Sequence, residues 1–527
     1  MTGRPTVFGP RAVLLFACLL VIAVYASMMD LKGITTDEGF RLWIIHGGQS
    51  LARGEPAADA SWSRVLAANR PHAYQPLYFL IQNSLMRALH ADGLAFFRSV
   101  NLAFLGLGLL GLLALSRDWR LGPRLFLLGV FSFNAFLFMH VLQIREYIAG
   151  IAFYIWSTWV VLELDRRQLE RPGADAGWFA GYGGLLAAGF YLQSWVVFPA
   201  IGQFLFLLLR RRARAGRFLA LLALTYVIVL GATVPYLGLH RQKVDVGRWA
   251  SESESVQSHL SNGFHLVLAG QAAGHARFTD FLFVFWLAVI AGGAFLFLWD
   301  RTAAPAPAAA AESRRQGWLM LLCIAVSLAF QLGYTLFVEN LALWPRYFVI
   351  HYFFLAWLIA LSFRYIWELR AAGAAGWARR GLTLTAGALA AVLAASAVYQ
   401  VRSFRADPYL DTSQNHVSNW RNAATTLARL VRPGDTVVTS DFINRTTLTF
   451  TRPLSNEVMV LAELEEHGPP AAGRLVYLEP AGLRAQRDQL AARLAARGYT
   501  VSGESPVFAP DGVSATDDWR ILVFSRR

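Results

Sequence analysis

Long apolar stretches alternate with short polar segments along most of the chain. A helix that spans a bilayer needs about 20 mostly apolar residues, and about eleven stretches approach that length. They lie near 12–29, 97–116, 122–141, 146–164, 177–192, 193–209, 218–238, 278–299, 318–338, 347–366 and 381–399. Residues 177–209 form either two spans or one long re-entrant unit. The pattern predicts a mainly α, polytopic membrane helix bundle.

Two apolar segments need separate treatment. Residues 76–89 are too short to span, and Gln82, Asn83 and Arg87 interrupt them. They are therefore predicted to form an amphipathic helix on the outer membrane surface. The first run, 12–29, is long for the apolar core of a cleaved signal peptide. We therefore expect it to remain as an uncleaved first span.

The composition agrees with this class of protein. Of the 527 residues, 56% are hydrophobic and 16% are charged, and the mean hydropathy is +0.41. Soluble domains carry about 25% charged residues, so an ordinary soluble enzyme, a disordered chain and a coiled coil are excluded. Cys18 and Cys323 both lie in apolar runs. That placement excludes a disulfide framework and a cysteine-based zinc site.

The net charge of +14 follows the predicted loops. Most of the excess lies in the short connections of one side and at the N-terminus. These segments hold Arg4, Arg11, Arg117, Arg120, Arg124, Arg166, Arg167, Arg171, Arg210, Arg211, Arg212, Arg214, Arg217, Arg301, Arg314, Arg315, Arg364, Arg370, Arg379 and Arg380. Basic loops face the cytoplasm. The N-terminus is therefore predicted to be cytoplasmic and loops 30–95 and 240–277 to lie outside, and no nucleic-acid partner is indicated.

The tail, 400–527, differs from the rest of the chain. A helix capped by Ser418 and ending near Leu430 precedes a turn at 433–435. Strands are predicted at Thr436–Ser440, Arg474–Leu478 and Trp519–Phe524, and a helix at 481–497. This alternation predicts a small α/β domain outside the membrane. The domains are thus 1–399, transmembrane, and 400–527, extracytoplasmic.

Six charged residues lie in or against the apolar runs, all at predicted outer helix ends. They are Arg98, Arg145, Glu146, Asp280, Glu339 and Arg346. Each one alone is compatible with an interfacial side chain that reaches water. Charge near the membrane is also a frequent mark of function. Together, the six suggest a polar cavity that opens outward.

The first outer loop adds acidic residues. Thr35-Thr36-Asp37-Glu38 precedes a predicted helix, Gly39–Leu51. One interpretation is a helix N-cap with favourable acids in the first turn. The other is a carboxylate at the membrane surface that accepts a proton or binds a cation. The sequence leaves both open.

Two arginines lie beside tyrosines at outer helix ends, in Arg145-Glu146-Tyr147 and Arg346-Tyr347. The planar guanidinium fork matches the geometry of a phosphate, as in a lipid headgroup. The alternative is structural pairing of the two arginines with Glu146 and Glu339.

These residues resemble motifs of the GT-C glycosyltransferases, in the bacterial branch related to protein mannosyltransferases and aminoarabinose transferases. The resemblance is carried by Asp37-Glu38, Tyr74-Gln75-Pro76-Leu77-Tyr78, Phe97-Arg98, Gln143-Ile144-Arg145-Glu146-Tyr147, Arg346-Tyr347, Trp420-Arg421 and Pro433-Gly434-Asp435. It is best over residues 12–165.

The resemblance implies transfer of a sugar from a polyprenyl-phosphate donor to a glycan, lipid or protein acceptor outside the cytoplasmic membrane, with inversion. Asp37 and Glu38 are then the catalytic candidates. The candidates for binding the donor phosphate are Arg145, Arg346, Tyr147 and Tyr347. Further candidates for the cavity are Arg98, Glu146, Tyr78 and Glu339. Glu38 and Glu146 either orient the acceptor or hold a divalent cation.

Two other classes compete with this one. A transporter or flippase for a lipid-linked glycan typically shows paired repeats, broken helices and charge at the bilayer midplane. A non-catalytic scaffold that displays the tail leaves the membrane-edge arginines and acids without a role.

Overall fold

The computed structural model divides into two compact units. Unit 1 comprises residues 1–29, 73–78 and 99–413; unit 2 comprises 30–72, 79–98 and 414–527. The structure describes residues 9–31, 35–48, 61–72, 74–170, 176–210, 216–241, 256–271, 276–299, 308–337, 345–371, 376–406, 420–440, 442–451, 456, 458–467, 474–479, 484–508 and 515–526.

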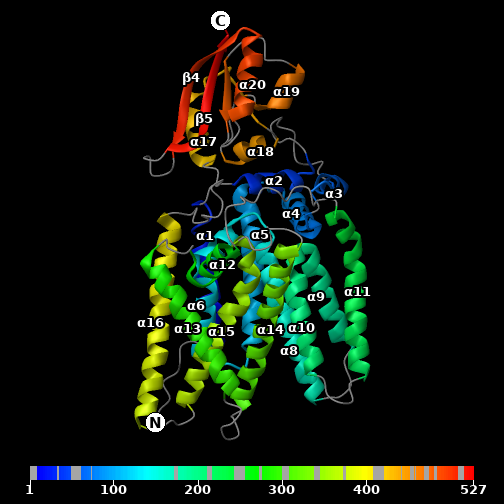
Figure 1. Ribbon diagram of the computed structural model, residues 1–527, viewed down its shortest axis with the longest axis vertical. Helices are drawn as coiled ribbons and strands as arrows, with labels where there is room; N and C mark the ends of the chain where they lie inside the picture. Colours follow the sequence, from blue (N-terminus) through cyan, green and yellow to red (C-terminus); the bar gives the residue numbers. More distant parts are fainter. Residues whose placement is uncertain are drawn as a thin grey trace. The chain divides into compact units, whose positions relative to one another are not determined.

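All regular secondary structure among the described residues of unit 1 is helical (Figure 1). Its helices are α1 Pro10–Ala26, α6 Leu121–Ser132, α7 Ala135–Leu142, α8 Tyr147–Glu170, α9 Ala176–Leu192, η3 Ser194–Val196, α10 Val197–Leu209, α11 Gly216–Arg241, α12 Val256–Ala269, α13 Arg277–Trp299, α14 Ala308–Phe337, η6 Pro345–Phe348, α15 Val349–Ala371 and α16 Gly376–Ala406. Helices α4 (Pro76–Leu89) and α5 (Leu94–Leu115) contribute residues to both units.

The predicted polytopic fold is confirmed. Within the described residues, seven helices are long and apolar enough to cross a membrane, and the bent pair α6–α7 makes an eighth. The other three predicted spans coincide with shorter helices, α1, α9 and η3–α10. Residues 177–209 form two helices that separate at Gln193.

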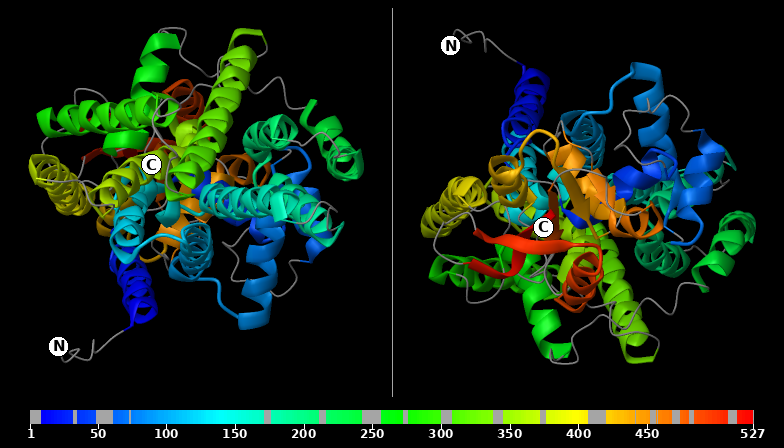
Figure 2. Two further views of the ribbon diagram at one scale, coloured as in Figure 1. Left: turned by 90° about the horizontal axis from the view of Figure 1, so that it is seen from below. Right: turned by 90° about the horizontal axis from the view of Figure 1, so that it is seen from above.

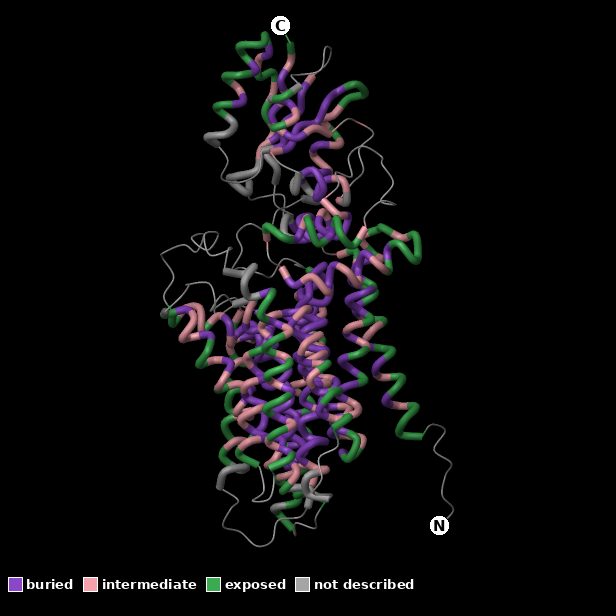
Figure 3. The backbone as a smooth tube through the Cα atoms, turned by 90° about the vertical axis from the view of Figure 1, so that its right-hand side faces the viewer, coloured by how far each residue is buried: buried purple, intermediate pink, exposed green. Residues whose placement is uncertain are grey.

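Burial divides the helices into inner and outer ones. Most residues of α8 and α15 are buried, whereas most of α11, α13 and α16 are not. Helices α11 and α16 lie at opposite edges of the bundle in Figures 1 and 2, and buried residues fill its interior in Figure 3. The exposed apolar side chains of the outer helices are those expected to face lipid.

The predicted span 122–141 is one continuous apolar run, but it is broken. Helices α6 and α7 meet at an angle of 66° around Phe133 and Asn134. The Tyr25 hydroxyl donates to the carbonyl of Ser132 at 2.8 Å, and the Tyr352 hydroxyl donates to the carbonyl of Phe131. Asn134 caps α7 by accepting from the Phe136 N–H. These bonds satisfy backbone groups that the break releases.

An ionic cluster around two buried carboxylates lies at the C-terminal half of α8, beside the predicted basic loops. Glu163 accepts from Arg117, Arg166 and Arg167. Asp165 pairs with the Arg315 guanidinium from α14 at 3.2 Å, and more distantly, at 3.6 Å, with Arg210 after α10. Both carboxylates are buried. The cluster thus ties three other segments, those of Arg117, Arg210 and Arg315, to one end of α8.

Unit 2 contains a mixed sheet and the helices of the first loop. Its elements are α2 Thr36–Ile45, α3 Trp62–Asn69, α17 Trp420–Leu430, β1 Thr436–Thr439, α18 Phe442–Thr451, β2 Val458–Val460, α19 Leu461–His467, β3 Leu475–Glu479, α20 Arg484–Ala495, β4 Tyr499–Phe508 and β5 Ala515–Arg526. The strand order is β2-β1-β3-β5-β4. Strands β1, β2 and β3 are parallel, and β5 is antiparallel to both β3 and β4.

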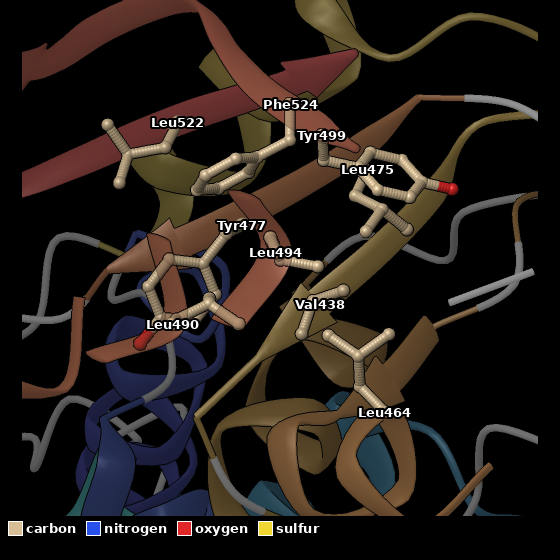
Figure 4. Packing of buried hydrophobic residues seen from close by; sticks show 9 residues of the cluster. All are labelled: Val438, Leu464, Leu475, Tyr477, Leu490, Leu494, Tyr499, Leu522 and Phe524. Atoms are coloured by element: carbon tan, nitrogen blue, oxygen red, sulfur yellow. The ribbon is translucent and has the colours of Figure 1, made fainter. Parts of the chain in front are cut away.

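The small α/β domain is therefore confirmed, and the predicted strands correspond to β1, β3 and β5. The sequence missed β2, β4 and the helices α18 and α19. Its core is built from side chains on the strands, α19 and α20, including Val438, Tyr477, Leu490 and Phe524 (Figure 4). Ser418, the predicted cap, lies outside the described residues.

The first-loop helices are partly as predicted. Residues 76–89 do form a helix, α4. The predicted helix Gly39–Leu51 is wrong in its bounds, because α2 begins at Thr36 and ends at Ile45. Two glycines with positive φ, Gly47 and Gly48, follow this end and turn the chain away.

We predict that Arg315→Met destabilises the protein by about 3 kcal/mol, because the buried Asp165 loses its close partner. Arg210→Met is the matched control: its side chain is largely exposed, and its removal should change stability by less than about 1 kcal/mol. Thermal unfolding in detergent measures both. Equal losses would contradict the assignment of Arg315 as the main counter-charge.

Candidate functional site

The first candidate group, in unit 1, surrounds the turn between α7 and α8. Residues 143–146 form this turn, and the Arg145 N–H donates to the Gln143 carbonyl at 2.8 Å. Asn101 on α5 donates its amide N–H to the same carbonyl. The Tyr78 hydroxyl in turn donates to the Asn101 side-chain oxygen at 3.0 Å. A chain of hydrogen bonds thus fixes the backbone that carries Arg145.

The ionisable side chains of this turn are buried. Arg145, Glu146 and Tyr147 are each 5% exposed or less. The Arg145 guanidinium carbon lies 5.8 Å from the centroid of the Tyr147 ring. That ring meets His140 edge-on, with centroids 4.7 Å apart. Arg145 is therefore a cation held between helices beside an aromatic face.

The short helix η3 connects this turn to other segments. The Gln75 amide donates to the Ser194 hydroxyl at 2.6 Å. A Cβ on Gly150, in the first turn of α8, would lie 3.0 Å from the Cβ of Gln193. The Trp195 ring stacks on Tyr347 of η6, with centroids 4.9 Å apart. Segments carrying Tyr78, Arg145 and Tyr347 therefore converge on η3.

Gln331 and His351 form polar contacts next to Tyr347. The Gln331 amide donates to the Tyr347 carbonyl at 3.4 Å, and the Gln331 oxygen lies 2.7 Å from Nε2 of His351. The backbone of Arg346 belongs to η6, but its side chain lies outside the described part of the structure. Glu339 lies outside the described residues altogether.

The second candidate group, in unit 2, is the start of α2. Thr35 and Glu38 form a reciprocal capping box: the Glu38 N–H donates to the Thr35 hydroxyl at 3.2 Å, and the Thr35 N–H donates to Oε2 of Glu38 at 2.9 Å. The helix-cap interpretation of this segment is thus confirmed. It does not exclude the functional one, because Asp37 lies between the two capping residues.

Glu38 has a second partner. Its Oε1 lies 3.6 Å from an Arg98 guanidinium nitrogen, and both side chains are essentially unexposed. The alternative of an interfacial Arg98 that reaches water is therefore wrong. Both oxygens of Glu38 thus have partners. The side chain of Asp37 lies outside the described part of the structure.

At the C-terminal end of α2, His46 is buried against Phe97, with ring centroids 5.9 Å apart. Burial lowers the pKa of His46 from 6.5 to about 4, and the charge of Asp92 opposes this shift. The imidazole is therefore neutral at pH 7. The Asn83 amide donates to the neighbouring Ile45 carbonyl at 2.8 Å and fixes the end of α2.

Sequence reasoning missed several members of these groups. Asn101, His140, Gln193, Ser194 and Trp195 are uncharged or lie inside apolar runs. The one signal that the sequence offers for such residues is a polar side chain within an otherwise apolar run. Among the described residues, no group of three or more His, Cys, Asp or Glu side chains could hold a metal ion. The divalent cation at Glu38 or Glu146 stays a prediction.

Solved structures share this architecture. ArnT from Cupriavidus metallidurans in the apo state aligns over 98% of this chain and 98% of that chain, with a TM-score of 0.54 and 14% identity. The chain has the fold of ArnT. ArnT bound to undecaprenyl phosphate aligns over 97% of both chains, with a TM-score of 0.52 and 14% identity.

A third similar structure is AglB, the archaeal oligosaccharyltransferase from Archaeoglobus fulgidus, in complex with an inhibitory peptide and a dolichol-phosphate. It is 12% identical, aligns over 98% of this chain and 74% of that chain, and has a TM-score of 0.48. No protein-family model matches the chain, and no curated protein matches it. The resemblance to aminoarabinose transferases predicted from the sequence is confirmed at the level of the fold by the ArnT structures.

We predict that acidification destabilises unit 2 between pH 6.5 and about 4. In this window the unfolded chain protonates His46 and the folded chain does not, so the unfolding free energy falls as the pH falls, by at most about 3 kcal/mol. Hydrogen exchange of α2 at pH 7 and pH 5 measures the effect. His46→Phe should remove most of this dependence; an unchanged dependence would contradict the assignment to His46.

Proposed function

We propose that the chain is an inverting membrane glycosyltransferase that moves a sugar from a polyprenyl-phosphate donor to an acceptor outside the bacterial cytoplasmic membrane. The main support is the GT-C fold over nearly the full length of the chain. ArnT with this fold was solved bound to undecaprenyl phosphate. The buried Arg145, fixed at the start of a membrane helix, supplies a cation of the kind that such a phosphate needs.

Arg145 and Arg346 are proposed to bind the donor phosphate, with Tyr147 and Tyr347 beside them. When the bond between the anomeric carbon and the phosphate oxygen breaks, negative charge develops on the leaving polyprenyl phosphate. A guanidinium stays charged at any relevant pH and can bond two phosphate oxygens. Removal from water strengthens this attraction, and Arg145 is buried. Tyr78 acts through Asn101 on the turn that carries Arg145.

Asp37 is proposed as the general base. It takes the proton of the acceptor hydroxyl as that oxygen attacks the anomeric carbon, and the phosphate leaves from the opposite face. One displacement inverts the anomeric centre, as in inverting glycosidases. Glu38, bonded to the Thr35 N–H and paired with Arg98, is better suited to position α2 than to bind substrate. Glu146 remains a candidate to orient the acceptor or hold a divalent cation.

The topology proposal rests on charge. The arginine-rich loops and the ionic cluster at the end of α8 favour the cytoplasmic side. The N-terminus would then be cytoplasmic and the domain 400–527 periplasmic, with the acceptor a glycan, lipid or protein there. Membrane lipids would cover the outer helices α11, α13 and α16.

One observation favours the second candidate function, a transporter or flippase of a lipid-linked glycan. Broken membrane helices are frequent in transporters, and α6–α7 is broken. A transfer assay separates the two. Purified protein in vesicles receives undecaprenyl phosphate carrying a radiolabelled hexose or pentose, together with an envelope fraction as acceptor. Label leaving the lipid for an acid-stable product supports the transferase; movement of intact lipid between leaflets supports transport.

We predict that Asp37→Asn lowers transfer by at least about 100-fold, because loss of a general base removes about 10²–10⁴ in rate. Folding and membrane insertion should be intact, as judged by size-exclusion profile and thermal unfolding. The matched control is Asp92→Asn, an exposed acid of the same unit. Turnover near the wild-type rate in Asp37→Asn would remove Asp37 as the base.

We also predict that Arg145→Gln lowers kcat about 100-fold, since one preorganised donor to a developing anion contributes about 3 kcal/mol. The protein should also lose protection by undecaprenyl phosphate in thermal unfolding. Arg167→Gln, at the other end of α8 and paired with Glu163, is the control and should keep that protection. Equal protection of Arg145→Gln and wild type would refute phosphate binding by Arg145.

A further inference from the structure

Gly39, two residues after Asp37, lies at an unusually close helix contact within unit 2. Helix α2 of the first loop packs against α18 of the C-terminal sheet domain (Figure 1). A Cβ placed on Gly39 would lie 1.8 Å from the Thr447 hydroxyl oxygen, 2.9 Å from its Cβ and 3.2 Å from its Cα. No side chain larger than hydrogen fits unless the two helices move apart. The contact therefore fixes the spacing of α2 and α18.

Helix α18 is itself held firmly to the sheet domain. Arg445, one helical turn ahead of Leu448, is buried and donates to both oxygens of Glu463, at 3.0 and 2.8 Å. Glu463 also accepts from the Val460 N–H at the end of β2. Thr447 and Leu448 are fully buried. Moving α18 away from α2 would therefore disturb this buried ion pair or the sheet.

Helix α2 has little freedom on its other sides. The Thr35–Glu38 capping box fixes its first turn, and the Glu38–Arg98 pair ties that turn to α5. The Asn83 amide fixes its last turn. Asp37 lies in the same first turn as Gly39, so a shift at Gly39 displaces Asp37 as well.

From this geometry we infer that α18 is a positioning element for the proposed base, and that Thr447 is the positioning residue opposite Gly39. The C-terminal domain then sets the place of Asp37, besides any role in choosing the acceptor. The inference rests on the proposed function, in which Asp37 must meet the acceptor hydroxyl. A misplacement of a reacting group by about 1 Å can lower the rate about 100-fold.

The test is a pair of complementary substitutions in the full-length protein. Gly39→Ala introduces the clash, and Thr447→Gly removes the opposing side chain. We expect Gly39→Ala to lower kcat about 100-fold, Thr447→Gly to lower it only slightly, and the double variant to recover most of the loss. Gly93→Ala is the matched control, because the space around a Cβ there is open in the same unit.

A merely structural role gives a different result. Substitutions that only destabilise the fold would lower the unfolding temperature and the amount of folded protein, and the kcat of the folded fraction would stay at the wild-type value. A wild-type kcat in Gly39→Ala, or a double variant no faster than Gly39→Ala, overturns the inference. The assay uses the radiolabelled undecaprenyl-phosphate sugars and envelope fraction described above.

Hydrogen exchange of the α2 amides separates this inference from the proposed function. Gly39→Ala should speed their exchange, and Thr447→Gly in the same chain should restore it, whether or not sugar is transferred. If wild type and Gly93→Ala transfer no sugar from either donor, the proposed function fails. If wild type transfers sugar but exchange in Gly39→Ala equals that of wild type, the positioning inference alone fails.

Discussion

A backbone inside a membrane must bond all of its polar groups within the protein, and the rest of unit 1 depends on this constraint. Straight helices meet it without help. The two irregular stretches, at Phe133–Asn134 and at residues 143–146, meet it only because side chains from distant segments bond the released groups. Tyr25 and Tyr352 do so at the first, and Asn101 with Tyr78 does so at the second. Both irregular stretches lie among buried residues, where such partners are available.

This constraint explains why Arg145 lies where it does. A guanidinium on a regular apolar helix would face either lipid or a tightly packed neighbour. At the turn before α8 the backbone polar groups lie outside the helical hydrogen-bond pattern, and the side chains around them already form hydrogen bonds. The cost of burying one more charged group is therefore smaller there than elsewhere in the bundle. The proposed site for the lipid phosphate would therefore not require the bundle to open to water.

The sequence predicted the parts of this protein that depend on local composition. Apolar run length found the membrane helices, and strand and turn patterns found β1, β3 and β5. It could not predict the break at Asn134, because the residues on both sides are equally apolar. Nor could it pair Glu38 with Arg98 or stack Trp195 on Tyr347, since these contacts join segments 60 and more residues apart. The short β2 and the helix α18 gave too weak a periodic signal.

In the candidate site, charge singled out Asp37, Glu38, Arg98 and Arg145 in the sequence. Charge alone did not distinguish structural roles from catalytic or binding roles. The capping box and the buried ion pair assign Glu38 and Arg98 to holding α2. Neutral residues such as Asn101 and Ser194 escaped notice, because an amide or hydroxyl in an apolar run is compatible with many packed environments.

The ionic cluster at the end of α8 also fixes the position of this helix along the membrane normal. Glu163 and Asp165 cannot be drawn into hydrocarbon, so they hold that end of the helix at the water boundary. Tyr147, where α8 begins directly after the turn that carries Arg145, lies about 24–27 Å from these two carboxylates along the helix axis, at 1.5 Å per residue. That length is close to the roughly 30 Å thickness of a bilayer's hydrocarbon layer. In the proposed topology, the depth of Arg145 is therefore set from the opposite leaflet, and lipids with shorter or longer acyl chains would meet its guanidinium at a different level.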